Sequence, residues 1–93
     1  MDLGYKTTAR VFKAFCDENR LQILDLLREN ELCAFQLQEA LEIGQSTLSH
    51  HMKVLCESGI VIARREGKWT YYRIDAAGSG HAIDLLRQLT GLK

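Results

Sequence analysis

Apolar side chains recur every three or four residues along the chain as far as Glu57, which is typical of amphipathic helices. This spacing predicts four helices, over residues 5–16, 18–29, 33–42 and 45–57. Asp17 is expected to cap the second helix by accepting backbone N–H bonds, and Asn30 to end it in a left-handed conformation. Gly59 is the expected left-handed residue after the fourth helix. The second helix is predicted to bury its large apolar side chains, Leu21 among them.

The pattern changes after the fourth helix. Residues 60–65 and 69–74 are rich in β-branched and aromatic side chains and flank a turn that contains glycine, which predicts a hairpin. Gly78 and Gly80 are expected to break the chain before a last amphipathic helix over residues 81–91. The apolar face of that helix has nothing obvious to pack against in so small a domain.

These elements predict a mainly α fold with one β-hairpin, in a single domain over residues 1–93. Ile43 and Gly44 leave room only for a tight turn between the third and fourth helices, so these two helices form a helix-turn-helix. The second helix of such a pair can lie in the major groove of DNA. The first and last helices can pair with those of a second copy across a two-fold axis, which would make the protein a homodimer.

Composition and charge exclude further classes of protein. The 93 residues carry twelve Lys and Arg against twelve Asp and Glu, and 46% are hydrophobic, which is a globular composition. No apolar run approaches the ~18–20 residues that a bilayer requires, so no membrane partner is expected. The N-terminus lacks a signal-peptide core, so the chain is expected in the cytoplasm. The charges are segregated, with a net −3 over residues 1–44 and a net +3 over residues 45–73. A basic segment can hold phosphates even in a neutral chain.

The helix predicted over residues 45–57 carries groups that suit DNA. The amide of Gln45 can make paired hydrogen bonds to adenine, hydroxyl groups can bond base edges or phosphates, and Lys53 supplies a charge for a phosphate. The DNA contacts of this helix are expected from Gln45, Ser46, Thr47, Ser49, His50, His51 and Lys53. Adjacent histidines point about 100° apart on a helix, so His50 and His51 suit DNA contact or packing better than joint metal binding.

The predicted hairpin is both basic and aromatic. A basic ribbon beside a reading helix is what an accessory phosphate clamp, or wing, requires. The alternative is a solvated hairpin with an aromatic anchor. The expected DNA contacts of the hairpin are Arg64, Arg65, Lys68, Trp69 and Tyr71.

A set of short sequence motifs, taken together, is characteristic of one protein family. The motifs lie at residues 12–14, 17, 20–24, 31–33, 45–55, 58–61 and 64–72. With these motifs the chain resembles the arsenical-resistance and metal-sensing repressors of the ArsR/SmtB type, over nearly its whole length. The resemblance implies a winged helix-turn-helix homodimer paired through its first and last helices. It also implies repression by binding to a palindromic operator in double-stranded DNA, relieved when a ligand binds the protein.

The cysteines depart from the pattern of that family. Arsenic-sensing members that the chain resembles carry a Cys-x-Cys pair at the start of the third helix, whereas here Cys33 is followed by Phe35 at the second position. As(III) and Sb(III), the inducers that the resemblance implies, prefer three thiolates, so Cys16, Cys33 and Cys56 would have to converge. The alternative is that each is a small packed side chain. A zinc site on the last helix is rejected, because only residues 81–84 echo the family's zinc ligands.

The leading hypothesis is a DNA-binding repressor without an obligatory cofactor, released from DNA by As(III) or Sb(III). One alternative keeps DNA binding but makes the signal the oxidation of a thiol. Another is a winged-helix protein-interaction module without DNA binding, against which the basic aromatic hairpin argues. An enzyme is not expected, because the histidines have no Ser, Cys or carboxylate partner at a catalytic spacing and no Gly-rich phosphate loop is present.

Overall fold

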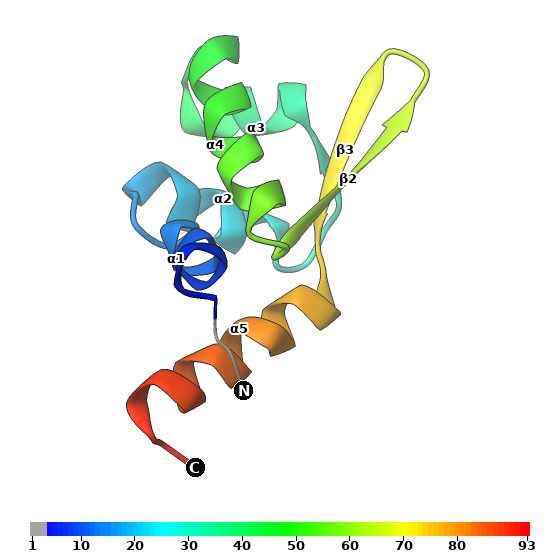
Figure 1. The fold of residues 1–93 in the computed structure, drawn as a ribbon. Coiled ribbons are helices and arrows are strands. Elements are labelled where there is room, and N and C mark those ends of the chain that lie inside the picture. The colour runs from blue at the N-terminus through cyan, green and yellow to red at the C-terminus, as the bar shows by residue number, and fades with distance from the viewer. Residues whose placement is uncertain (1–3) are drawn as a thin grey trace.

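The computed structural model describes residues 4–93; residues 1–3, on which the expectation about an N-terminal signal partly rests, lie outside the described residues. Four helices form the body, a hairpin projects from one side of it, and the last helix runs along the end opposite the hairpin tip (Figure 1). In chain order the elements are α1 (Tyr5–Lys13), α2 (Glu18–Leu27), β1 (Leu32–Cys33), α3 (Ala34–Leu41), α4 (Gln45–Glu57), β2 (Val61–Glu66), β3 (Trp69–Ile74) and α5 (Ala76–Thr90). The prediction of a mainly α fold with a β-hairpin is confirmed.

The sheet has three antiparallel strands in the order β1-β3-β2, one more than the hairpin alone. In the hairpin, Arg64 lies opposite Tyr71 and Arg65 opposite Thr70. The added strand β1 has only two residues, and Cys33 pairs with Tyr71 of β3. So short a strand leaves no alternation in the sequence, which is why the pattern did not predict it.

Two of the three predicted helix ends are confirmed. The Asp17 carboxylate accepts the backbone N–H groups of Asn19 (2.8 Å) and Arg20 (3.4 Å) and so caps α2. Gly59, with φ 82°, follows α4 in the left-handed region. The expectation for Asn30 is wrong: among residues 4–93 the non-glycine residue with positive φ is Glu42, and α2 ends earlier because the chain turns directly into β1.

The predicted start of the last helix is wrong, since α5 begins at Ala76 and contains both Gly78 and Gly80. The Asp75 carboxylate caps this helix by accepting the N–H of Gly78 (3.1 Å), and the Asp75 N–H donates to the carbonyl of Ile60 (2.8 Å). A Cβ at Gly78 would overlap the carbonyl oxygen of Gly59. Gly78 therefore does not end a helix. Its missing side chain lets the backbone of α5 lie against the backbone of the turn between α4 and β2.

Buried side chains from α1, α2, α3, α4, β2 and α5 form one core. Its members are Val11, Ala14, Ile23, Leu27, Leu37, Leu48, Met52, Leu55, Ile60, Val61, Ala82 and Leu85. Leu21 was predicted to join them but is 49% exposed, because it lies on the outer side of α2. On α5, Ile83, Leu86 and Leu89 are each about half exposed, so much of its apolar face is uncovered within the chain. Within the described part of the chain no helix is long and apolar enough to span a bilayer.

Replacing Gly78 by Ala is expected to lower the free energy of unfolding by about 1–3 kcal/mol, because the new methyl group must displace the backbone at Gly59. Gly80→Ala is the matched control in the same helix, since a Cβ there meets no atom within 4 Å. That control is expected to be neutral or to stabilise by up to about 1 kcal/mol. Urea denaturation at equal protein concentrations measures both, and equal effects would contradict the close approach.

Candidate nucleic-acid interface

Helix α4 separates a buried from an exposed face. Leu48, Met52 and Leu55 are almost completely buried. Gly44, the residue before the helix, provides no side-chain cap, so the N–H groups of the first turn stay available to an anion. The exposed residues of the predicted DNA-contact set on this helix are Gln45, Ser46, Thr47, Ser49, His50 and Lys53.

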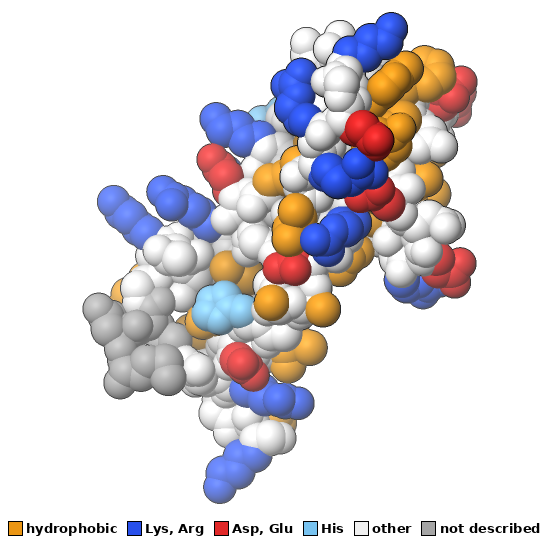
Figure 2. All heavy atoms as spheres, turned by 90° about the vertical axis from the view of Figure 1, so that its right-hand side faces the viewer, with side chains coloured by type: hydrophobic (Ala, Val, Ile, Leu, Met, Phe, Trp, Pro, Cys, Tyr) orange, Lys and Arg blue, Asp and Glu red, His pale blue; other side chains and the backbone are white. Residues whose placement is uncertain are grey.

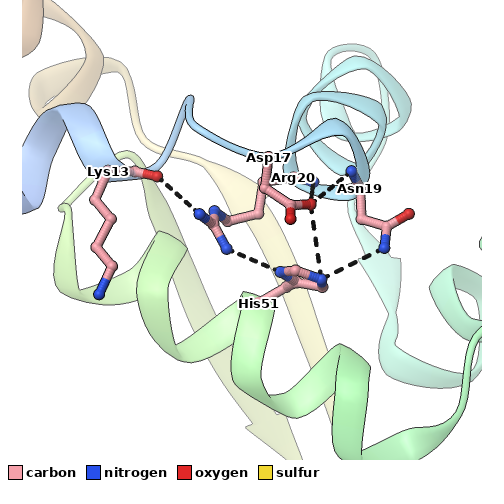
Figure 3. Close-up of polar contacts among 5 residues, drawn as sticks. All are labelled: Lys13, Asp17, Asn19, Arg20 and His51. Carbon is pink, nitrogen blue, oxygen red and sulfur yellow. Dashed lines mark hydrogen bonds and ion pairs between the residues drawn. The ribbon is translucent and has the colours of Figure 1, made fainter.

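His51 differs from the other members of that set, because it is only 6% exposed and points into the body. Its Nδ1 lies 3.0 Å from Nη1 of Arg20, which is also 6% exposed. Nη2 of Arg20 donates to the backbone carbonyl of Lys13 at the end of α1 (3.1 Å). On the other side of the ring, Nε2 lies 3.8 Å from Asp17 and 3.5 Å from the amide of Asn19 (Figure 3). The expectation that His51 contacts DNA is therefore corrected: His51 serves packing.

The geometry of this junction of Lys13, Asp17, Asn19, Arg20 and His51 sets the protonation of the ring. A guanidinium group can only donate hydrogen bonds, so Nδ1 of His51 must accept and the ring proton must sit on Nε2, facing Asp17. The amide nitrogen of Asn19, 3.5 Å from Nε2, is itself a donor and therefore makes no hydrogen bond to the protonated Nε2. Burial, together with the charges of Arg20 and His50, lowers the pKa of His51, and the Asp17 carboxylate offsets this only in part. The imidazole is neutral at pH 7.

Arg20 was not predicted as part of a site, although the sequence carries a signal for it. Arg20, Ile23 and Leu27 are three and four residues apart, and all three are buried. A positive charge on the buried face of a helix requires a partner from another element, and α4 provides it.

The hairpin of β2 and β3, hereafter the wing, carries its basic side chains in two environments. Arg64 is held on one face: it contacts both carboxylate oxygens of Glu31 (2.6 and 3.3 Å) and one of Glu66 (2.7 Å). Its guanidinium carbon also lies 4.7 Å from the ring centroid of Tyr71. Hydrogen bonds from Arg64 lower the pKa of Glu31, and those carboxylates raise the pKa of Arg64. The charge of Arg64 is thus largely compensated within the chain.

Arg65 is adjacent in sequence and therefore lies on the opposite face of β2. That face is the one turned toward α4, because Ala63, two residues earlier, lines a hollow with Ser49 and Lys53 of that helix. Lys68 lies at the wing tip, 5.6 Å from the Trp69 ring. Figure 2 looks onto the wing side of the molecule and shows Asp and Glu side chains among the Lys and Arg side chains there.

The three cysteines do not form a metal site within one chain. Cys16 is exposed, Cys33 is buried and Cys56 is half-buried. Burial raises the pKa of the Cys56 thiol, which disfavours the thiolate that a metal needs. Among residues 4–93, no three His, Cys, Asp or Glu side chains are grouped so that they could hold a metal ion. The sequence left open whether Cys16, Cys33 and Cys56 converge; among the described residues of a single chain they do not form such a group.

An apolar hollow of about 320 Å³ lies on the side of the body where α5 runs. Its walls include Phe12 of α1, Leu24 of α2, and Ile83 and Leu86 of α5. Phe15, directly after α1, is a further wall residue and is 40% exposed. Together with the uncovered face of α5, this hollow forms an apolar surface, hereafter the α1–α5 surface.

The comparisons with known proteins agree with this geometry. The family model described as a bacterial regulatory protein of the arsR family matches residues 17–63. The arsenical resistance operon repressor of Staphylococcus aureus is 41% identical over 94% of this chain and 81% of its own length.

Two solved structures are similar over nearly the whole fold. One is the homodimeric winged helix-turn-helix DNA-binding domain of a possible ArsR-family regulator from Mycobacterium bovis, with a TM-score of 0.74 and 34% identity, covering 94% of this chain and 81% of that one. The other is HlyU from Vibrio cholerae, with a TM-score of 0.74 and 35% identity, covering 96% and 97%. These relatives are regulators of transcription, HlyU being named a transcriptional activator.

Proposed function

The chain belongs to the ArsR family of bacterial regulatory proteins, and on that premise we propose that it is a homodimeric repressor that binds a palindromic operator in double-stranded DNA. The observation that carries this proposal is the face of α4, where six exposed side chains with amide, hydroxyl, imidazole and ammonium groups lie opposite a fully packed apolar face. A bacterial protein that binds an operator must be in the same compartment as the chromosome, so we also propose a cytoplasmic location.

The proposed base contacts come from the first half of α4. The Gln45 amide matches the donor and acceptor of adenine in the major groove, and the hydroxyl groups of Ser46, Thr47 and Ser49 suit base edges or phosphates. His50 adds a ring donor, and Lys53, one turn further along the helix, supplies a charge for the DNA backbone.

The proposed phosphate contacts of the wing come chiefly from Arg65 and Lys68. Trp69 and Tyr71, which pair with Glu66 and Arg64 and therefore lie on the other face of the wing, are proposed as further DNA contacts. Arg65 lies on the face of β2 that is turned toward α4, and no carboxylate among residues 4–93 forms an ion pair with it. Arg64, in contrast, already contacts two carboxylates. We therefore expect the two adjacent arginines to differ in their effect on DNA affinity.

Arg65→Ala is expected to reduce the slope of log affinity against log salt by about one unit, which corresponds to one phosphate contact. Arg64→Ala is the matched control and is expected to change the slope much less. Fluorescence anisotropy with duplex DNA from the promoter upstream of the protein's own gene, between about 50 and about 200 mM KCl, measures both slopes. Equal slopes for the two variants would contradict this assignment, and no binding even at low salt would favour the protein-interaction module.

We propose that the homodimer forms through the α1–α5 surface. In a domain of 93 residues much of the apolar face of α5 is left uncovered, and a second copy would cover it. A two-fold axis there would set two α4 helices about one turn of DNA apart, which is why a palindrome is expected.

Leu86→Arg is expected to convert the dimer into a monomer, because a guanidinium would be buried in the α1–α5 surface without a partner. DNA affinity should then fall by about 100-fold or more, since the two half-sites are no longer linked. Leu26→Arg is the control, because Leu26 is an exposed leucine of α2 that does not line that surface. Analytical ultracentrifugation and the same anisotropy assay test this; a Leu86→Arg dimer with intact DNA binding would contradict the interface.

We propose that the dimer is released from DNA by As(III), Sb(III) or a similar thiophilic ligand at cysteine thiolates. The name of the Staphylococcus aureus relative supports this inducer class. Since one chain offers no group of three ligands in residues 4–93, three thiolates would have to come from both chains of the dimer. The ligand can release DNA only if it binds more tightly to a dimer whose α4 helices are misplaced.

As(III) is expected to abolish the mobility shift of the wild type and to leave that of Cys33→Ser intact, whereas Zn(II) should have no effect on either. Release of Cys33→Ser by As(III) would show that Cys33 is not a ligand. Release by a mild oxidant alone would instead favour the thiol redox sensor. Cys16→Ser removes the exposed thiol. Release of this variant from DNA would show that the reaction takes place at Cys33 and not at the surface thiol.

A further inference from the structure

We propose that Arg20 and His51 are positioning residues that fix the rotation of α4 against the α1–α2 corner, and that operator recognition therefore requires a neutral His51. This inference rests on the proposed function, because it concerns how the face of α4 is aimed at DNA.

The first support is that the junction joins three helices through two buried side chains. Arg20 of α2 reaches His51 in the middle of α4 (3.0 Å) and the carbonyl of Lys13 at the end of α1 (3.1 Å). Both residues are only 6% exposed. The rest of the buried face of α4 is apolar, and apolar contact has no preferred direction. Hydrogen bonds do have one, so this contact is the feature that defines the rotation of α4.

The second support is the position of His51 within the reading helix. His50 is its direct neighbour, and Ser49 and Lys53 lie two residues to either side, all three on the exposed face. A rotation of α4 that followed from losing the Arg20 contact would move these side chains together away from the base edges. It would also change their position relative to α1, which belongs to the proposed dimer surface.

The third support is that the contact tolerates only one charge state. The charged and titratable groups that face His51 are Asp17 and Arg20 at the start of α2 and His50 on α4, while α1 contributes the Lys13 carbonyl through Arg20. A proton on Nδ1 would remove the acceptor for Arg20 and set two cations in contact. Asp17 faces the other ring nitrogen and cannot replace that acceptor.

Three variants test the proposal. His51→Gln retains a carbonyl oxygen that can accept from Arg20 but does not titrate. His51→Leu fills the space without an acceptor. His81→Gln, at an exposed histidine of α5 that has no part in the proposed DNA contacts, is the matched control. Affinity for promoter DNA and for an unrelated duplex is measured at pH 7.5 and 5.5. Protonation increases the attraction to phosphates in both duplexes, so the ratio of the two affinities at each pH is free of that effect.

At pH 7.5 His51→Gln should keep the affinity ratio of the wild type within about threefold, whereas His51→Leu should lower it by tenfold or more. Between pH 7.5 and 5.5 the ratio should fall by about twofold or more for the wild type and for His81→Gln, as part of His51 becomes protonated, but change little for His51→Gln. A mere loss of stability would reduce binding to both duplexes and leave the ratio unchanged. Should His51→Leu not fold, the comparison of the wild type with His51→Gln decides alone.

The imidazole ¹⁵N spectrum of the wild type at pH 7.5 gives a readout that is independent of DNA, and should show His51 protonated at Nε2. Equal pH profiles for the wild type and His51→Gln, or a His51 protonated at Nδ1, would overturn the proposal. Failure of the wild type to bind either duplex at pH 7.5 would instead refute the proposed function and this inference with it.

Discussion

One buried guanidinium holds the helical body together, and the arrangement of the interface depends on it. Arg20 sits between the end of α1, the start of α2 and the middle of α4, where water is excluded from most of its surface. Its two terminal nitrogens bond to the neutral ring of His51 and to the Lys13 carbonyl, while its Nε has no hydrogen-bond partner among residues 4–93. A buried charge needs such acceptors, so the three helices meet in an arrangement that brings both to Arg20.

The same constraint explains why the exposed side of α4 can be purely polar. With the orientation of the helix set from its inner side, its outer residues need no structural contacts and remain exposed. The wing projects from the body (Figure 1), and Arg64, midway along β2, contacts Glu31 just before β1 and the ring of Tyr71. One arginine there holds the wing to the body, and its neighbour, Arg65, is left to meet DNA. The net charge of zero therefore does not show that the two adjacent arginines differ, one compensated by carboxylates and the other available to DNA.

Much of the fold could be predicted from periodicity and turn residues, since α4, the hairpin and Gly59 depend on local preferences. The failures share a different cause. Leu32–Cys33 becomes a strand, Gly78 enters a helix and His51 turns inward because of contacts with residues far away in sequence. The exposed half of the interface was therefore predictable, and its buried support was not. The cysteines were left open for the same reason, because sequence spacing does not determine whether three thiols converge.

In the proposed complex two copies of α4 read one operator across a two-fold axis. A hydroxyl-radical footprint of the wild-type protein on the promoter upstream of its own gene tests this arrangement. We expect two protected blocks related by two-fold symmetry, with centres about 10 base pairs apart, flanked by weaker protection where the wings contact the backbone. A single block without symmetry, or an unprotected promoter at low salt, would contradict it.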